Sequence, residues 1–127
     1  MFTCSSNWNS RFSKDIPLPM QRAIIEPYCV KNKISYNSYE FENEHMDWQP
    51  GLEYYIKERP NGIVLCSMYS FTDDVTRRSE LLQLALDKGV ELHFANELVS
   101  LKCREDLEKI ETYLNFAVPK LGPHVWE

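Results

Sequence analysis

The chain has 127 residues, of which 43% are hydrophobic and 26% charged, and its formal net charge is −5. This length and composition predict one globular domain and exclude disorder over most of the chain. The acidic balance argues against nucleic acid as a partner, because such a surface repels a phosphate backbone. No apolar run approaches the roughly 20 residues of a membrane span, and the start lacks the blocks of a secretory signal, so we expect a cytoplasmic protein without a membrane contact.

The first half of the chain predicts two strands and two helices. Residues 2–5 form a short strand that a polar, proline-bearing loop follows. Apolar residues at helical spacing predict a helix over 19–31, although Pro27 should cost one hydrogen bond and kink it. The alternating segment 34–41 predicts a strand, and residues 49–58, after an acidic loop, predict a short helix.

The second half predicts two more strands and two more helices. The continuous apolar run 63–66 is typical of a central parallel strand that is covered on both faces. A helix over 75–89 has aspartates at its start and stops at a glycine. Residues 90–96 predict a strand and residues 103–115 a last helix. The segment 117–127 contains two prolines and a glycine, which predicts an extended tail behind a single domain over 1–116.

The alternation of strands and helices predicts a three-layer α/β fold of the flavodoxin type. Its expected sheet has four parallel strands in the order 2-1-3-4, with helices on both faces. Ligands of such sheets bind beyond the carboxyl ends of the strands, near the point where the strand order reverses. The sequence therefore predicts a crevice between the ends of the first, third and fourth strands.

Polar residues follow these strands and should line the crevice. Hydroxyl and guanidinium groups donate to phosphate or carboxylate, so we expect an anion to bind there. The residues concerned are Ser5, Ser6, Arg11, Ser67, Ser70, Arg77 and Asn96. Arg77 and Arg78 point about 100° apart on a helix, so only one of them can reach the crevice. The alternative is that the serines form turns or cap helices and that the arginines form a solvated surface.

Three residues are candidates for proton transfer, namely His93, Tyr69 and Glu97. His93 shares its strand face with Glu91, and the alternative for this histidine is a hydrogen-bonded core position. The four cysteines include no C-x-x-C pair, and His45 lies among carboxylates that are normally just solvated. The sequence therefore predicts neither a metal nor a cofactor.

Three segments, "IPLPMQRAIIEPYCVKNK", "GIVLCSMYSF" and "GVELHFANE", resemble the pattern of the sporadic carbohydrate-cluster proteins, small bacterial proteins that are encoded among genes for surface sugars. The resemblance extends over most of residues 1–115. It implies a setting in glycan or sugar-nucleotide biosynthesis, and it adds weight to Gln21, Ser67 and His93, which lie in the matching segments. We expect a sugar or sugar phosphate as the ligand.

The layout of elements is also similar to the catalytic domain of serine recombinases, which implies a resolvase-like fold. In that family a serine at the end of the first strand attacks DNA phosphate, and Ser5 or Ser6 would match it. The arginine that should precede it is replaced by Thr3 or Cys4, and "SMYSFTDD" replaces the arginines that should follow the third strand. Without these guanidinium groups a phosphoryl transition state loses several kcal/mol of stabilisation, so DNA cleavage is disfavoured.

Two hypotheses of function follow from the sequence. The first is an enzyme that acts on a phosphorylated or acidic sugar in the crevice. The second is a non-catalytic binding or assembly subunit, because the tail and the aromatic residues of so small a chain could pack against another copy. In either case we expect a homo-oligomer.

Overall fold

Strands and helices alternate in the computed structural model of the protein, which describes residues 2–6, 18–41, 48–58, 61–68, 71–72 and 74–116. In chain order the elements are β1 (Phe2–Ser6), α1 (Leu18–Lys31), β2 (Tyr36–Phe41), α2 (Pro50–Lys57), β3 (Gly62–Leu65), α3 (Val75–Lys88), β4 (Glu91–Phe94), β5 (Val99–Leu101) and α4 (Arg104–Phe116). The predicted site residues Arg11, Tyr69 and Ser70 and the predicted tail lie outside the described residues.

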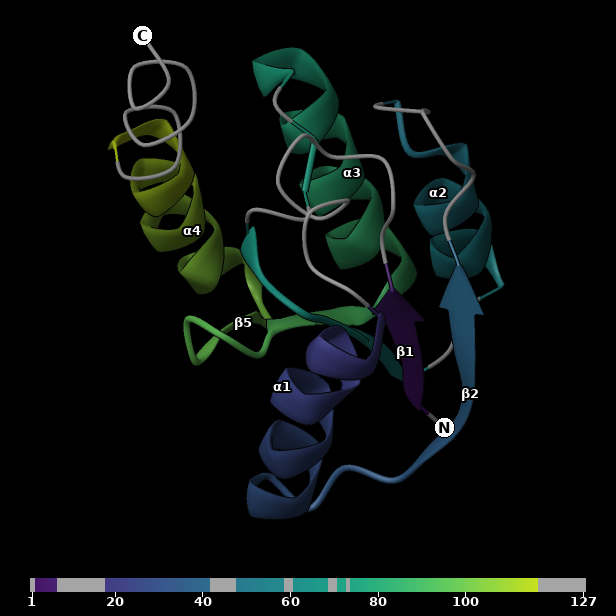
Figure 1. The fold of residues 1–127 in the computed structure, drawn as a ribbon. Coiled ribbons are helices and arrows are strands. Elements are labelled where there is room, and N and C mark those ends of the chain that lie inside the picture. Colours follow the sequence, from purple (N-terminus) through teal and green to yellow (C-terminus); the bar gives the residue numbers. More distant parts are fainter. Residues whose placement is uncertain are drawn as a thin grey trace, which may run out of the picture.

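The described strands form one sheet in the order β2-β1-β3-β4-β5 (Figure 1). β1 pairs in parallel with β2 and β3, and β3 pairs in parallel with β4. β5 runs antiparallel to β4. The fold is α/β, but the expected four-stranded, wholly parallel sheet is wrong, because the sheet is mixed and a fifth strand forms its edge beside β4.

The fifth strand follows a tight turn that carries no glycine or proline. Phe94 pairs with Val99 across this turn, and the Leu98 amide donates to the Ala95 carbonyl at 3.3 Å. Leu98 takes the left-handed backbone conformation, with φ at 59°. Glycine or asparagine normally occupies such a position, so the leucine here gives no signal of a hairpin turn. The three-residue strand behind it was therefore missed.

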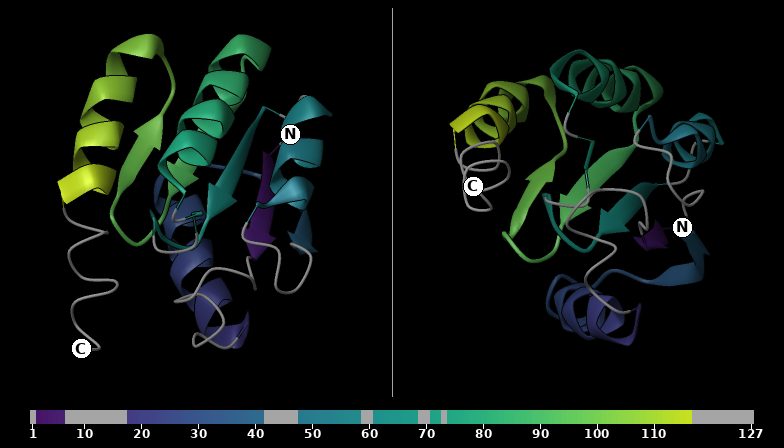
Figure 2. Two further views of the ribbon diagram at one scale, coloured as in Figure 1. Left: turned by 90° about the horizontal axis from the view of Figure 1, so that it is seen from above. Right: turned by 45° about the horizontal axis from the view of Figure 1, so that its top comes forward.

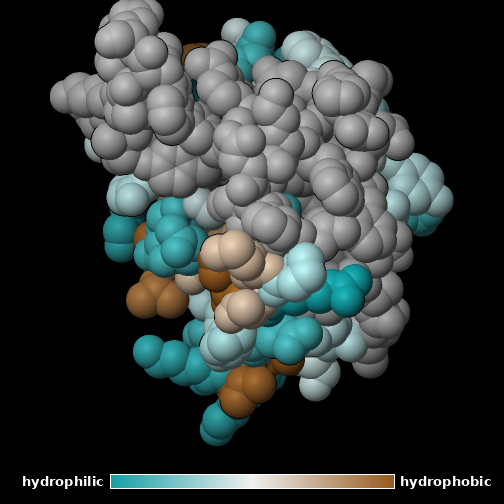
Figure 3. Space-filling model, in the orientation of Figure 1, coloured by the Kyte–Doolittle hydropathy of each residue, from teal (hydrophilic) through white to brown (hydrophobic). Residues whose placement is uncertain are grey.

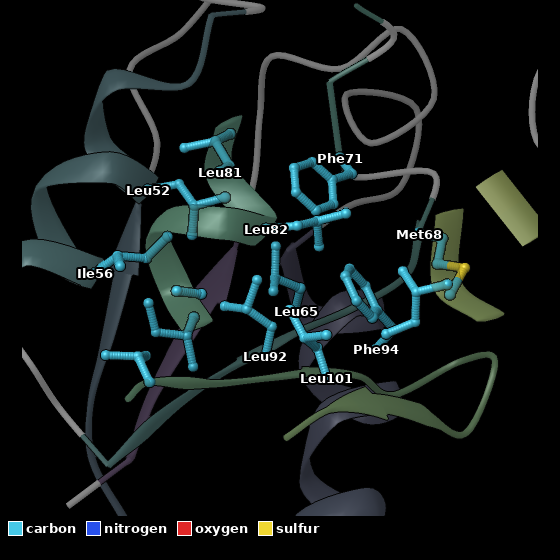
Figure 4. Close-up of a cluster of buried hydrophobic side chains, with 14 of the residues drawn as sticks. Leu52, Ile56, Leu65, Met68, Phe71, Leu81, Leu82, Leu92, Phe94 and Leu101 are labelled. Carbon is cyan, nitrogen blue, oxygen red and sulfur yellow. The ribbon is translucent and has the colours of Figure 1, made fainter. Parts of the chain in front are cut away.

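Helices cover both faces of the sheet (Figure 2). α2, α3 and α4 lie on one face, where their apolar side chains pack on β3, β4 and β5 in the larger core cluster (Figure 4). α1 covers the other face, where Ile25, Tyr28 and Cys29 pack against Val64, Cys66 and Ala95. β3 is therefore covered on both sides, as its unbroken apolar sequence predicts.

Local signals place the ends of α3 and the start of α2. The Asp74 carboxylate caps α3 by accepting a hydrogen bond of 2.8 Å from the Arg77 amide. The helix ends at Gly89, whose φ of 70° suits a residue without a Cβ. Pro50 opens α2, where its missing amide costs nothing. Pro27 lies inside α1, which nevertheless continues to Lys31.

The carboxyl ends of β1, β3 and β4 meet at one edge of the sheet. Ser5 pairs with Leu65, and Leu65 pairs with Phe94. Beyond the strands the chains remain adjacent, because the Asn96 amide donates to the Cys66 carbonyl at 2.8 Å. The residues that follow β3 and β4 are thus held side by side. In the described part of the chain, no helix combines the length and apolarity needed to cross a bilayer.

Candidate binding site at the carboxyl end of the sheet

The Glu97 carboxylate is the centre of a polar cluster at this edge. The Ser67 hydroxyl donates to Glu97 Oε2 at 2.6 Å, and the Met68 amide donates to Glu97 Oε1 at 2.8 Å. The Asn96 side-chain amide donates to Oε2 at 3.2 Å. We call Ser67, Asn96 and Glu97 the edge cluster. All three were predicted from the sequence to lie at the crevice, and the structure brings them together.

The three residues of the edge cluster differ in how far they are exposed to solvent. Ser67 is buried, Glu97 is half-buried and Asn96 is exposed. A carboxylate offers about four acceptor positions, of which these contacts occupy three. The cluster can therefore hold its own geometry through the buried serine and still present carboxylate and amide groups to a ligand.

The negative charge of Glu97 influences the pKa of the buried Cys66 thiol. Burial, and after it the charge of Glu97, raises the pKa of Cys66 to about 11. The thiol is therefore protonated and unreactive at neutral pH. Cys66 acts as a small apolar residue of the core beneath α1.

Gln21 comes near this edge through α1. It lies in the first turns of the helix and is buried. Ile25, one turn later on the same face, packs with Cys66 and Ala95, the residues just before Ser67 and Asn96. Ser5 and Ser6 end β1 at the same edge, on the other side of β3 from β4.

The Arg77 side chain forms hydrogen bonds to α2 and to Trp48, which precedes this helix. Its guanidinium donates to Glu53 Oε1 at 2.6 Å and to the Trp48 carbonyl at 2.7 Å, and it lies 4.5 Å from the centre of the Trp48 ring. Hydrogen bonds from Lys57 and then Arg77 lower the pKa of Glu53. Arg78 is also buried, where it lines a small pocket between α3 and α4. Sequence reasoning expected one arginine to be exposed towards the crevice, yet α3 buries both.

His93 lies in the middle of the sheet and not at its carboxyl edge. The Tyr28 hydroxyl and His93 Nδ1 are 2.6 Å apart, and His93 Nε2 is 2.8 Å from Glu91 Oε1. Glu91 is the first residue of β4, so this chain of hydrogen bonds runs away from the edge where Glu97 lies. Sequence reasoning placed Glu91 on the same strand face but missed Tyr28, whose inward position on α1 was the available signal.

The tautomer of His93 follows from its two partners. A carboxylate can only accept, so Nε2 carries the proton, and Nδ1 accepts from the Tyr28 hydroxyl. Burial lowers the pKa of His93, and the hydrogen bond from Nε2 to Glu91 opposes this effect in part. Burial also raises the pKa of Tyr28. Among the described residues, no group of three His, Cys, Asp or Glu side chains is placed to hold a metal ion.

No family model matches the chain, and no curated protein matches it. Its fold is similar to the crystal structure of a resolvase family site-specific recombinase from Streptococcus pneumoniae, with a TM-score of 0.65 and 11% identity over 94% of this chain and 85% of that one. It is also similar to the N-terminal catalytic domain of TP901-1 integrase, with a TM-score of 0.63 and 8% identity over 99% of this chain and 98% of that one. These comparisons confirm the resolvase-like fold and give no support to the resemblance to carbohydrate-cluster proteins.

Proposed function

We propose that the protein binds a sugar or sugar phosphate through the sugar's hydroxyl groups at the edge cluster. The observation that carries this proposal is the convergence of the Ser67 hydroxyl, the Met68 amide and the Asn96 amide on the Glu97 carboxylate. A carboxylate fixed in this way is oriented before any ligand arrives, which lowers the entropic cost of binding.

The chemistry of the edge cluster matches neighbouring hydroxyl groups. Each sugar hydroxyl can donate one hydrogen bond and accept others, as serine hydroxyls do. Glu97 would accept from one hydroxyl, and Asn96 would donate to a second and accept from a third. Hydrogen bonds to a charged group are the stronger ones, so Glu97 should dominate the affinity.

Charge decides which part of a sugar phosphate lies at Glu97. A phosphate beside the carboxylate would be repelled, so the hydroxyl-bearing ring belongs at the edge cluster and the phosphate farther away. If the protein is an enzyme, Glu97 is placed to take a proton from the hydroxyl that it binds. The proposed setting in surface-carbohydrate or sugar-nucleotide biosynthesis rests on the sequence segments quoted above.

Ligand binding can be tested by recording amide chemical shifts during titration with neutral hexoses, hexose phosphates and nucleotide sugars. We expect saturable shifts at residues 66–68 and 95–97. Glu97→Gln should weaken binding about tenfold or more, because one charge-assisted hydrogen bond contributes about 1.5 to 3 kcal/mol. Ser67→Ala should weaken it less, because that residue only orients Glu97.

Glu108→Gln is the matched control, since it removes the same charge from an exposed position on α4. It should leave the affinity unchanged. The proposal is wrong if no sugar in the panel shifts these amides, or if Glu97→Gln binds as tightly as the wild type while its spectrum shows a folded protein.

The solved structures of similar fold suggest DNA cleavage as the alternative. The TM-scores support a shared fold, whereas the chemistry requires cationic groups around the scissile phosphate. In the described part of the chain, the guanidinium of Arg77 is committed to Glu53 and Arg78 is buried. We therefore favour the sugar ligand.

A further inference from the structure

Trp48 is an aromatic residue that is held in place and yet exposed. It lies just before α2 and is 51% exposed. The Arg77 guanidinium lies 4.5 Å from the centre of the indole ring, and Arg77 Nε donates to the Trp48 carbonyl at 2.7 Å. The guanidinium therefore covers one face of the indole, so the exposed surface belongs largely to the other face and to the ring edge.

The backbone that follows Trp48 is fixed as well. Gln49 takes the left-handed conformation, with φ at 57° and ψ at 56°, which is strained for a residue with a Cβ. Gln49 is buried, and its Oε1 accepts a hydrogen bond of 2.9 Å from the Thr72 amide. Strained positions persist where neighbouring contacts fix them, and they are common at ligand-binding sites. The contacts on both sides of Trp48 thus orient its indole before any ligand arrives.

Trp48 lies at the same edge of the sheet as the edge cluster. Its partner Arg77 is in the first turn of α3, which begins where β3 ends and leads back to the start of the parallel strand β4. α2 and α3 lie side by side in Figure 1, and Figure 3 shows pale, weakly polar side chains that project at the right margin, where α2 lies. The exposed indole therefore stands on the carboxyl edge, where ligands of such sheets bind.

A short path joins the edge cluster to Gln49. Met68 follows Ser67, and its carbonyl accepts from the Phe71 amide at 3.0 Å, which closes a turn. Thr72 comes next and donates to Gln49. The turn and this hydrogen bond together cover on the order of 10 Å, which is more than one sugar ring spans. A ligand that contacts both Glu97 and the indole therefore has to extend along the edge of the sheet.

We propose that the exposed face of Trp48 is a second subsite, which stacks on one ring of a neutral oligosaccharide while another ring of the same ligand lies at Glu97. This inference rests on the proposed function, because the edge cluster has to bind the first ring. The C–H groups of a sugar ring form a flat apolar face, and an indole offers a flat partner that tolerates a wet site. The alternative is that the indole only shields the contact of Arg77 with Glu53 from water.

Charge favours a neutral oligosaccharide over a nucleotide as the ligand. The Asp74 carboxylate caps the start of α3, and the Glu97 carboxylate follows β4, so both lie at this edge of the sheet. Both would repel a phosphate that joined a base on Trp48 to a sugar at Glu97. The guanidinium beneath the indole is already bound to Glu53.

Titration of the isotope-labelled protein with neutral mono- to pentasaccharides tests this subsite. The indole N–H resonance of Trp48, identified by its loss in Trp48→Phe, is followed together with the amides of residues 66–68 and 95–97. Monosaccharides should shift the amides alone. Oligosaccharides should also shift the indole resonance and bind about tenfold more tightly, because a second ring is then in contact.

Two substitutions separate stacking from shielding. Trp48→Leu keeps an apolar side chain over Arg77 but has no flat face, whereas Trp48→Phe keeps one. The ratio of oligosaccharide to monosaccharide affinity should fall to about one in Trp48→Leu and only in part in Trp48→Phe. Tyr54→Ala is the matched control, because Tyr54 is 58% exposed in the second turn of α2, where its ring packs edge-on to Tyr55. It should leave this ratio unchanged.

The outcomes distinguish this inference from the proposed function. If monosaccharides shift the amides but no oligosaccharide shifts the indole resonance, the subsite at Trp48 is overturned and the edge cluster remains a sugar site. An unchanged affinity ratio in Trp48→Leu would overturn the subsite too. A nucleoside monophosphate that shifts the indole when oligosaccharides do not would overturn the sugar as its occupant. If no sugar shifts the amides, the proposed function fails and this inference fails with it.

Discussion

Burial favours a neutral imidazole in the hydrogen-bonded chain of Tyr28, His93 and Glu91. Protonation of His93 would place a proton on Nδ1, opposite the hydroxyl proton that Tyr28 now directs at that nitrogen. The hydrogen of the Tyr28 hydroxyl would then have to rotate away from His93, and its oxygen would accept from Nδ1. Buried polar chains of this kind stabilise the protein when every member is satisfied and destabilise it when one is not.

Stability should fall at acid pH because of His93. Burial holds the pKa of His93 in the folded protein below its usual value of 6.5, and the charge of Lys102 also lowers it, although Glu91 opposes this effect. The unfolded chain therefore binds a proton first as the pH decreases below about 6.5. The free energy of unfolding should decrease from that pH down to the folded pKa and level off below it. Urea unfolding of the wild type and of His93→Gln between pH 8 and pH 5 measures this effect.

The difference in stability between these two proteins isolates the histidine from the other titrating groups. It should favour the wild type most at neutral pH and shrink on acidification. A difference that stays constant with pH would contradict the assignment of the neutral imidazole.

Tyr28→Phe tests the other end of the same chain. The substitution removes the hydroxyl that donates to His93 Nδ1 and keeps the ring that packs edge-on to the imidazole. We expect a loss of about 1 to 2 kcal/mol of unfolding free energy, the cost of depriving a buried acceptor of its donor. Tyr54→Phe, on the exposed side of α2, is the control and should change stability little. Equal stability of Tyr28→Phe and the wild type in urea would show that the contact is not stabilising.

At the scale of elements, Arg77 joins α3 to α2. The buried Arg77 side chain reaches from α3 to the Trp48 carbonyl and to the Glu53 carboxylate. Arg77→Ala should destabilise the protein by about 1 to 3 kcal/mol, because the Trp48 carbonyl loses its donor and the packing between the helices is lost. The loss is smaller than for a fully buried ion pair, since Glu53 is part-exposed and keeps Lys57.

Lys57→Ala provides the comparison for Arg77→Ala, because Lys57 contacts the same carboxylate from the solvent side. An exposed pair of this kind contributes about 0.5 kcal/mol or less. Thermal unfolding of both variants should therefore show a larger decrease in Tm for Arg77→Ala. Similar decreases in Tm would mean that the buried contacts of Arg77 stabilise the protein no more than the exposed ion pair of Lys57 does.

The helices and most strands could be predicted because their signals are local. The start of α3 at Asp74 and its end at Gly89 are readable from residue types, and the buried run of β3 needs no partner to be recognised. β5 could not be predicted in this way. Leu98 adopts a strained left-handed conformation, and this strain is offset because the next three residues pair with β4. That pairing is a tertiary contact, which the local sequence does not reveal.

At the scale of the whole molecule, topology determined which of the predicted site residues lie together. Ser67 and Glu97 are 30 positions apart, but each follows a parallel strand, so any fold with β3 beside β4 brings them together. The direction of the Ser67 hydroxyl could not be foreseen, because it depends on which side chain comes within reach. His93 differs because it lies inside its strand, where alternation directs it to α1 and Tyr28.

The overall charge leads to the last prediction, which concerns DNA. The formal net charge is −5, and Arg77 and Arg78, the adjacent arginines of α3, are both buried within the fold. Binding to a duplex draws most of its strength from cations that replace the counterions of the phosphates. Fluorescence anisotropy with a labelled 30-base-pair duplex should therefore show no saturable binding at about 50 mM salt, where such contacts are strongest. The shared fold would then serve a different ligand from DNA. Binding that weakens steeply as salt is added would instead reveal a cationic surface, and the recombinase-like alternative would have to replace the sugar ligand.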